Sequence, residues 1–370
     1  MNMEIKSYDC DMVPGVRDFN SRLEMANVSH KFPETHISKL LPKQTGRKIY
    51  QEYFLAVHNS SVCGGYLLKH QEFSIGGKII SIADYQLPLS EGIIDKKYFF
   101  VGLQLLSHAL KQQPLLLCLG IGGLEQSIAQ MLAHMRWNIF LVPFYFKIHN
   151  AYRFLRNISY IRTTPLRKIT LDTMATLGVG GLIRLLQVRA VNTGLLGHTY
   201  HVEEIADFSA WADDLWAMCR EKYSMVAVRD RVTLNILYPV DDSRFIRLKI
   251  WQGTAVVGWA VLLDTHMSAH KQFGNMRVGS IVDCLALPEH ADGVIQVATK
   301  FLEMRKVDMI VSNQSHHSWR EALRKAGFFR GPSNYVFAAS KQLSLLLEPF
   351  DLNKSGFHIN RGDGDGPLHL

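Results

Sequence analysis

The chain has 370 residues, of which 47% are hydrophobic and 20% are charged, and this composition excludes a disordered or collagen-like protein. Its length favours two or three domains. The formal net charge of +8 favours polyanionic partners, such as a phosphorylated cofactor, RNA or an anionic membrane surface. The basic residues are scattered, so charge alone does not choose among these partners.

Cysteine usage and hydropathy predict the compartment. The five cysteines are widely spaced and form no C-x-x-C pair, which predicts reduced, buried thiols and no thiolate metal site. The first fifteen residues carry three acidic side chains and no apolar core, unlike a signal peptide. The longest apolar stretches fall far short of the ~18–20 residues that span a bilayer. We therefore expect a cytoplasmic protein without a transmembrane segment.

The first half of the chain predicts an antiparallel meander of three strands, followed by helices that alternate with strands. In chain order, we expect a helix at Val16–Val28, strands at Glu52–His58, Val62–Ser74 and Lys78–Leu87, a helix at Lys97–Gln112, a strand at Leu115–Leu119, a helix at Glu125–Met135 and a strand at Trp137–Phe146. The run at Leu115–Leu119 is wholly apolar, as suits a strand buried on both faces.

The second half repeats this order of elements. We expect strands at Phe245–Ile250, Val256–Leu263 and Arg277–Leu287, a helix at Ala291–Lys306, a strand at Val307–Ser312, a helix at Ser318–Ala326 and a strand at Asn334–Ala339. Matching elements lie about 190–200 residues apart in the two halves, which indicates two copies of one fold. The predicted class is α/β (α+β): two tandem domains, each a mixed, mostly antiparallel sheet flanked by helices.

The predicted domains are 1–150 and 202–345, with a basic helical connector at 151–201 and a tail at 346–370. Two interpretations of the connector stay open. Its arginines surround the apolar stretch Met174–Val188, which is typical of a basic amphipathic helix that contacts membrane or nucleic acid. The alternative is a connecting helix packed between the domains, since Gly178, Gly180 and Gly181 weaken an isolated helix.

The order of meander, helix, strand, helix and strand resembles the Gcn5-related N-acetyltransferase superfamily. The segment Ser318–Phe328 resembles its last helix and turn, in which a leucine precedes a Gly-Phe pair; here these residues are Leu323, Gly327 and Phe328. Glycine allows a left-handed end to the helix, and the aromatic residue after it packs the helix on the sheet. The first copy has Arg136-Trp137 at this place and lacks the glycine.

More narrowly, the chain is similar to double-domain acyltransferase-like proteins of bacterial surface-polysaccharide gene clusters, and more distantly to Fem-type peptidyltransferases. The segments Gln86–Gly92, Val142–Phe146, Arg153–Arg156 and Asn360–Pro367 carry this likeness. The resemblance implies an N-acyltransferase that uses acyl-CoA, acetyl or longer, on an amino sugar or a related amine. Two alternatives stay open: a Fem-like transferase that uses aminoacyl-tRNA, and a non-catalytic scaffold. No DNA partner is expected, and peripheral membrane contact is an option.

The superfamily grips the CoA pyrophosphate with a glycine-rich loop at the start of a helix. The matching segments here, Pro88–Ile94 and Pro288–Val294, are acidic and poor in glycine, which argues that at least one copy is a scaffold. By resemblance, the residues of the second copy that would bind the cofactor are Leu285, Ala286, Leu287, Ala291, Gly293 and Asn313.

Acyl transfer to an amine needs a base for the nucleophile and an acid for the leaving thiolate. By resemblance, the base would lie on the strand that corresponds to the superfamily's fourth strand. This residue is Asp84 in the first copy or Asp283 in the second, and Glu91 is a further candidate. Tyr335 on the last strand would protonate the thiolate. Because the second copy keeps Gly327 and its neighbours, we expect it to be the active one.

Two other motifs suggest chemistry less strongly. Adjacent His316 and His317 point to different sides and have no third ligand nearby in sequence, so no metal site is predicted. The tail Arg361–Gly366 has only two carboxylates, too few for a calcium loop. We expect this tail to fold back, with Asp363 and Asp365 facing basic residues or the substrate cleft.

Overall fold

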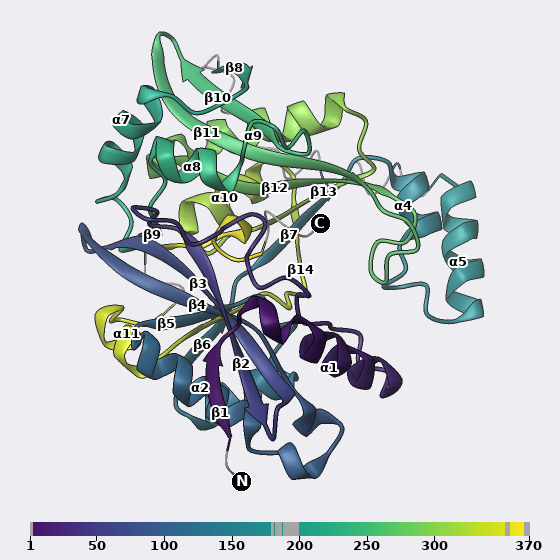
Figure 1. The fold of residues 1–370 in the computed structure, drawn as a ribbon. Coiled ribbons are helices and arrows are strands. Elements are labelled where there is room, and N and C mark those ends of the chain that lie inside the picture. Colours follow the sequence, from purple (N-terminus) through teal and green to yellow (C-terminus); the bar gives the residue numbers. More distant parts are fainter. Residues whose placement is uncertain (1–2, 179–180, 182–186, 188–199, 352–355, 366–370) are drawn as a thin grey trace. The chain divides into compact units, whose positions relative to one another are not determined.

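A computed structural model describes residues 3–178, 181, 187, 200–351 and 356–365 (Figure 1). The chain forms two compact units. The first comprises Met1–Phe140 and Val336–Phe350, and the second comprises Leu141–Tyr335 and Asp351–Leu370. Each unit contains a mixed sheet flanked by helices, which confirms the predicted fold class. Most of the predicted connector beyond Gly178 lies outside the described residues.

The first unit begins with a strand and a helix and continues with the predicted meander. Its elements are β1 (Glu4–Ser7), α1 (Val13–Met25), β2 (Tyr50–His58), β3 (Ser61–Ile75), β4 (Lys78–Ser90), α2 (Val101–Gln112), β5 (Leu116–Leu119), α3 (Ser127–His134), β6 (Asn138–Leu141), β15 (Val336–Ala339) and α11 (Lys341–Leu346). The strand order is β1-β2-β3-β4-β5-β15-β6. Strands β4 and β5 form a parallel pair.

Turn chemistry and one amphipathic helix explain the first unit. Asn59 and Ser60, with φ of 48° and 63°, link β2 to β3, and Gly76 and Gly77, with φ of 55° and 80°, link β3 to β4. Two consecutive left-handed residues are the signature of the tight turn that matches the twist of a hairpin. Helix α1 buries Val16, Phe19 and Leu23, which recur at helical spacing, against the sheet.

The second unit has the same order of strand, helices, meander, helix, strand and helix. Its elements are β7 (Phe144–Ile148), α4 (Ala151–Asn157), α5 (Pro165–Thr176), β8 (Tyr200–Ile205), α7 (Ala210–Cys219), β9 (Met225–Ala227), α8 (Arg231–Leu237), β10 (Ile246–Gln252), β11 (Ala255–His266), β12 (Arg277–Ala286), α9 (Ala291–Met304), β13 (Met309–Asn313), α10 (His317–Lys325), β14 (Phe329–Gly331) and β16 (Phe357–His358). The sheet order is β14-β7-β13-β12-β11-β10-β8.

The two copies exchange a strand. β7, from the end of the first copy, pairs with β13 in the second unit. β15, from the end of the second copy, pairs with β5 in the first unit. The compact units therefore differ from the predicted ranges 1–150 and 202–345, because hydrogen bonding to the sheet, and not position in the sequence, assigns these strands.

Two boundaries also differ from the predicted elements. The strand expected at Trp137–Phe146 is divided at Pro143 into β6 and β7, which belong to different sheets; proline lacks the N–H that a continuous ladder needs. The helix expected at Lys97–Gln112 begins at Val101, after two short 3-10 turns at Glu91–Ile93 and Lys96–Tyr98.

Candidate active site

In the second unit, the gap between the diverging strands β12 and β13 is filled by the chain's own tail. The two strands pair in parallel from Val278 to Ile281 and no further. Beyond that point, Gln314 forms a bridge with Asn360, and the N–H of Ser315 donates to the carbonyl of Ile359 at 3.0 Å. The tail thus folds back as expected, and it occupies the place where the resemblance would put the pantetheine arm of CoA.

Asp283 lies on β12 beside this tail and is 1% exposed. Its carboxylate accepts hydrogen bonds from four donors: Arg229 Nε at 2.7 Å, the Tyr238 hydroxyl at 2.7 Å, Asn360 Nδ2 at 2.9 Å and the N–H of Cys284 at 2.9 Å. A buried carboxylate with this many fixed partners is held in one orientation and acts as an anchor. The geometry favours a structural role for Asp283 over the expected role of general base.

Arg229 joins Asp283 to the tail. Its Nη2 donates to Asp363 Oδ1 at 2.6 Å, and the three side chains are at most 3% exposed. Burial opposes the charge of the guanidinium, but Asp283 and then Asp363 outweigh burial and raise the pKa of Arg229. The expectation that Asp363 would face a basic residue is therefore met within this unit.

The other second-copy residues expected at the cofactor are packed against protein. Leu285 and Ala286 are fully buried, and the Ala286 carbonyl accepts a hydrogen bond of 2.6 Å from the Tyr223 hydroxyl. The ring of Tyr200 on β8 covers Gly293 so closely that no Cβ would fit. Leu287 and Ala291 flank the short turn that leads into α9. The start of α9 thus offers little room for a pyrophosphate.

Asn313 and Tyr335 also have protein partners. Asn313 Nδ2 donates to the Val142 carbonyl at 3.5 Å, and the Tyr335 hydroxyl donates to the Asn360 carbonyl at 3.3 Å. Tyr335 precedes β15 and is not part of that strand, in contrast to the prediction. The structure brings Asp283 and Tyr335 together through Asn360, but as two contacts of the folded tail.

In the first unit, Asp84 marks the point where β4 and β5 separate. The strands pair only at Ala83 with Leu116 and Asp84 with Leu117. The N–H of Leu119, two residues farther along β5, donates to Asp84 Oδ1 at 3.1 Å. The carboxylate therefore sits in the gap between the strands, where the resemblance places the acyl group.

A chain of amides leads away from this carboxylate. Gln86 Nε2 donates to Asp84 Oδ2 at 2.7 Å, Gln51 Nε2 donates to Gln86 Oε1 at 2.9 Å, and the Ser38 hydroxyl donates to Gln51 Oε1 at 2.7 Å. Lys69, only 2% exposed, is the cross-strand partner of Asp84. A buried polar row of this kind fixes the orientation of its members.

The strand on which Asp84 lies is irregular just beyond the gap. Leu87 has φ of 44°, a left-handed conformation that is strained for a leucine. Next to Asp84, the Tyr85 ring is fully buried, and its hydroxyl has no hydrogen-bond partner among the described residues. Burial raises the pKa of Tyr85 well above its usual value, so the phenol stays a proton donor.

Glu91, the remaining catalytic candidate, has a structural partner. It is 5% exposed and forms an ion pair with Arg22 Nε of α1, while Arg22 Nη2 donates to the Val62 carbonyl at 2.6 Å. The nearby Ser90 hydroxyl caps the turn by accepting from the N–H of Gly92. This setting favours a role for Glu91 in attaching α1 to the sheet.

The loop that opens α2 is basic, in contrast to the acidic segment expected from sequence. Because the helix starts at Val101, the residues before it are Lys96 to Phe100, and both Lys96 and Lys97 are exposed. Among the residues that the structure describes, no side chain caps the helix and no atom lies within 4 Å of a Cβ added at Gly102. Uncapped N–H groups at a helix start favour anions.

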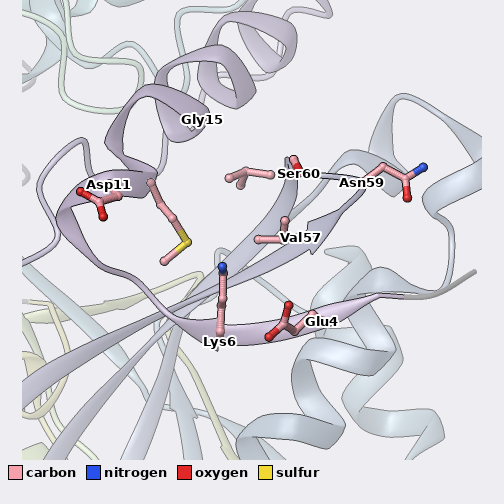
Figure 2. Close-up of a pocket in the computed structure, with 9 residues that line it drawn as sticks. Glu4, Lys6, Asp11, Gly15, Val57, Asn59 and Ser60 are labelled. Atoms are coloured by element: carbon pink, nitrogen blue, oxygen red, sulfur yellow. The ribbon is translucent and has the colours of Figure 1, made fainter.

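A separate cavity of about 430 Å³ lies at another edge of the first unit (Figure 2). Figure 2 shows that Glu4 and Lys6 of β1, Asp11 before α1, and the turn at Asn59 and Ser60 form its walls. None of the predicted site residues lines it. Because this cavity lies apart from the diverging strands β4 and β5, the gap at Asp84 is the stronger candidate.

Other expectations concern metals and membranes. In the part of the chain that the structure describes, no group of three or more His, Cys, Asp or Glu could hold a metal ion. Burial lowers the pKa of His316 to about 3, and that of His358 to about 3 as well. Over the same described ranges, no helix is long and apolar enough to cross a bilayer.

Four residues that hold the second unit's gap closed were not predicted as site residues: Arg229, Tyr223, Tyr238 and Asn360. Their side chains converge on Asp283 and Ala286 from segments far apart in the chain. One signal existed. Arg229 directly follows the apolar run Met225–Val228, and an arginine that ends a buried strand requires a buried acid.

No protein-family model matches the chain, and no curated protein matches its sequence. Among solved structures, a probable N-acyltransferase from Enterococcus faecalis is similar with a TM-score of 0.54 at 8% identity, over 94% of this chain and 74% of that one. A GCN5-related N-acetyltransferase from Anabaena variabilis gives 0.52 at 8% identity, over 91% and 72% of the two chains.

A third similar structure is Saccharomyces cerevisiae N-myristoyltransferase with bound myristoyl-CoA and inhibitors. Its TM-score is 0.51 at 8% identity, over 91% of this chain and 79% of that one. At such identities the likeness is one of fold. With its two copies of the strand, helix and meander pattern, the chain has the fold of the GCN5-related N-acetyltransferases, as tandem domains.

Proposed function

We propose that the chain is an acyl-CoA-dependent N-acyltransferase whose acyl-CoA site lies in the first unit. The observation that carries this proposal is the contrast between the two gaps. The second gap holds the chain's own tail, bonded to Asp283 through Asn360. In the first gap, Asp84 accepts hydrogen bonds from groups of its own sheet, the N–H of Leu119 and the amide of Gln86. The solved N-myristoyltransferase of similar fold has myristoyl-CoA bound, which supports a CoA thioester as the donor.

Asp84 would act as the base. It would take a proton from the attacking amine as the new N–C bond forms at the thioester carbonyl and the C–S bond breaks, and the departing thiolate would then take up a proton. Gln86 and the N–H of Leu119 would hold the carboxylate in place. The acceptor in this proposal is a primary amine, and an amino sugar is the first to test.

Lys96, Lys97 and the uncapped start of α2 would hold the pyrophosphate of CoA. Isothermal titration with acetyl-CoA and with a longer acyl-CoA tests this part. The double variant Lys96→Gln, Lys97→Gln should weaken binding by about tenfold, because two charges near a phosphate are lost. The matched control Lys39→Gln, Lys78→Gln removes two exposed lysines elsewhere in the first unit and should bind normally.

Asp84→Asn tests the chemistry. It keeps the shape of the side chain and should lower kcat by roughly 10²–10⁴-fold with little change in CoA affinity, as expected for a lost base. Turnover is followed by release of the free thiol with an amino-sugar acceptor. If neither acyl-CoA binds, the proposal fails. If the protein instead binds charged tRNA in a salt-sensitive way, a transferase that uses aminoacyl-tRNA takes its place.

A further inference from the structure

Helix α5 exposes an uncharged, apolar face. Leu166 is 75% exposed, Ile169 is 64% exposed and Leu177, directly after the helix, is 76% exposed. These positions recur at spacings that place them on one side of a helix. The other exposed residues on this side are Thr170, Thr173 and Thr176. Large apolar side chains on a solvent-facing helix, with no charge among them, mark an interaction surface.

The opposite side of α5 already has its packing partners. Leu171, Met174 and Ala175 contact a cluster that includes Phe154 and Leu155 of α4. Figure 1 shows α4 and α5 lying side by side as a helical pair. The inward face therefore stabilises the pair. Packing in the core does not explain why Leu166, Ile169 and Leu177 are apolar, because they lie on the exposed side.

The helical pair is strongly basic. Residues 151–177 contain four arginines and one lysine but a single acid, Asp172. Arg162 neutralises that acid with two hydrogen bonds of 2.8 and 3.1 Å and lowers the pKa of Asp172. Arg167 and Lys168 lie exposed on α5 itself, so the helix that carries the apolar face is also positively charged.

Two exposed tyrosines also belong to the helical pair. Tyr152 on α4 is 50% exposed and Tyr160, between the helices, is 57% exposed. Tyrosine has an apolar ring and a polar hydroxyl, and it is enriched where lipid headgroups meet the hydrocarbon of a bilayer. Apolar anchors, interfacial tyrosines and flanking arginine and lysine together are the composition of a peripheral membrane-binding helix.

We propose that the α4–α5 pair docks on the surface of a bilayer rich in anionic lipid. Leu166, Ile169 and Leu177 enter the boundary between headgroups and acyl chains, and the basic residues contact the lipid phosphates. The observations favour a membrane over RNA, because contacts with RNA phosphates would leave the three apolar side chains exposed to water. They favour it over a folded protein partner, because the charge around the face is of one sign.

Co-sedimentation of the full chain with vesicles tests the proposal. Vesicles of phosphatidylcholine with phosphatidylglycerol should bind the protein, vesicles of phosphatidylcholine alone should bind it at least tenfold more weakly, and about 1 M salt should abolish the difference. Leu166→Ser with Ile169→Ser should weaken binding by about tenfold or more. Both positions are exposed, so the fold is retained.

Matched controls lie elsewhere in the same unit. Val232→Ser with Met304→Ser removes two apolar side chains that are 61% and 71% exposed and should leave vesicle binding unchanged. Arg167→Gln with Lys168→Gln should weaken binding, whereas Lys271→Gln with Lys300→Gln should not. Absence of binding to anionic vesicles at low salt, or equal binding by the Leu166 and Ile169 variant, overturns the proposal. Binding to tRNA without binding to vesicles would overturn it too and assign the surface to RNA.

Discussion

Asp283 is a buried acid on β12, and its carboxylate accepts hydrogen bonds from the side chains of Arg229, Tyr238 and Asn360. A lone acid in an apolar strand is equally consistent with a base and with an anchor, because its type and burial are the same in both cases. The partners decide, and Arg229, Tyr238 and Asn360 come from remote segments. The sequence predicts a carboxylate on a strand in each copy, and Asp84 and Asp283 both lie buried on strands, but it does not predict the partners of either one.

We expect Asp283→Asn to lower the stability of the second unit. The change leaves the buried Arg229 with a single carboxylate partner, Asp363, and places the amide N–H₂ of the new asparagine against hydrogen-bond donors. Breaking a buried ion pair in this way lowers the free energy of unfolding by about 3–5 kcal/mol. Urea unfolding measures the loss. The control Asp242→Asn breaks the more exposed pair with Arg244 and should cost at most ~1 kcal/mol. A stable Asp283→Asn protein that has lost turnover would instead make Asp283 the base.

Among the elements, the tail is the one whose position matters most for the proposed function. Its short 3-10 turn at Arg361–Asp363 lies against β12, and Gly362 comes so close that an added Cβ would lie 2.5 Å from Asp283 Oδ2. Gly362→Ala should therefore displace the tail and increase hydrogen exchange at β9 and β16, which pair with each other. Mass spectrometry of the exchanged peptides measures this.

Gly356→Ala is the matched control for the tail, because its Cβ would meet Ser224 no closer than 3.4 Å. It should leave exchange unchanged. Equal exchange in both variants would show that the tail tolerates the extra atom. A gain of CoA binding by Gly362→Ala would show that the tail acts as a plug in a slot that is otherwise competent.

The strands were well predicted as local elements and poorly predicted as partners. Alternation and turn residues fix where the meander begins and ends, so the hairpins at Gly76 and Gly253 lie where they were expected. The exchange of β7 and β15 leaves no such trace, because both are short apolar strands that suit either sheet. The alternation of apolar and polar residues along a strand does not predict which other strand will pair with it.

At the scale of the whole molecule, acid should weaken the fold through two buried histidines. Burial lowers the pKa of His316 and His358 to about 3, whereas both titrate near 6.5 once unfolded. The unfolded chain therefore binds more protons below pH 6.5, so stability is complete above that pH and is lost as pH falls toward 3. The loss is at most about 1.4 kcal/mol per pH unit for each histidine.

Thermal unfolding between pH 7 and pH 5, above the range in which most carboxylates titrate, measures this effect. A His358→Asn variant should lose less stability over that interval than the wild type, whatever its stability at pH 7. An equal loss in both proteins would mean that the ring of His358 is charged in the fold.

The strand exchange also sets an order of events during synthesis. β5 ends at residue 119 but acquires its second neighbour, β15, only after residue 339 has been translated. When nine-tenths of the chain has been made, the N-terminal sheet therefore still has an open edge at β5, and open edges recruit foreign strands. The first sheet cannot be completed until β15 has been synthesised, so a prematurely terminated product would be a substrate for chaperones and proteases.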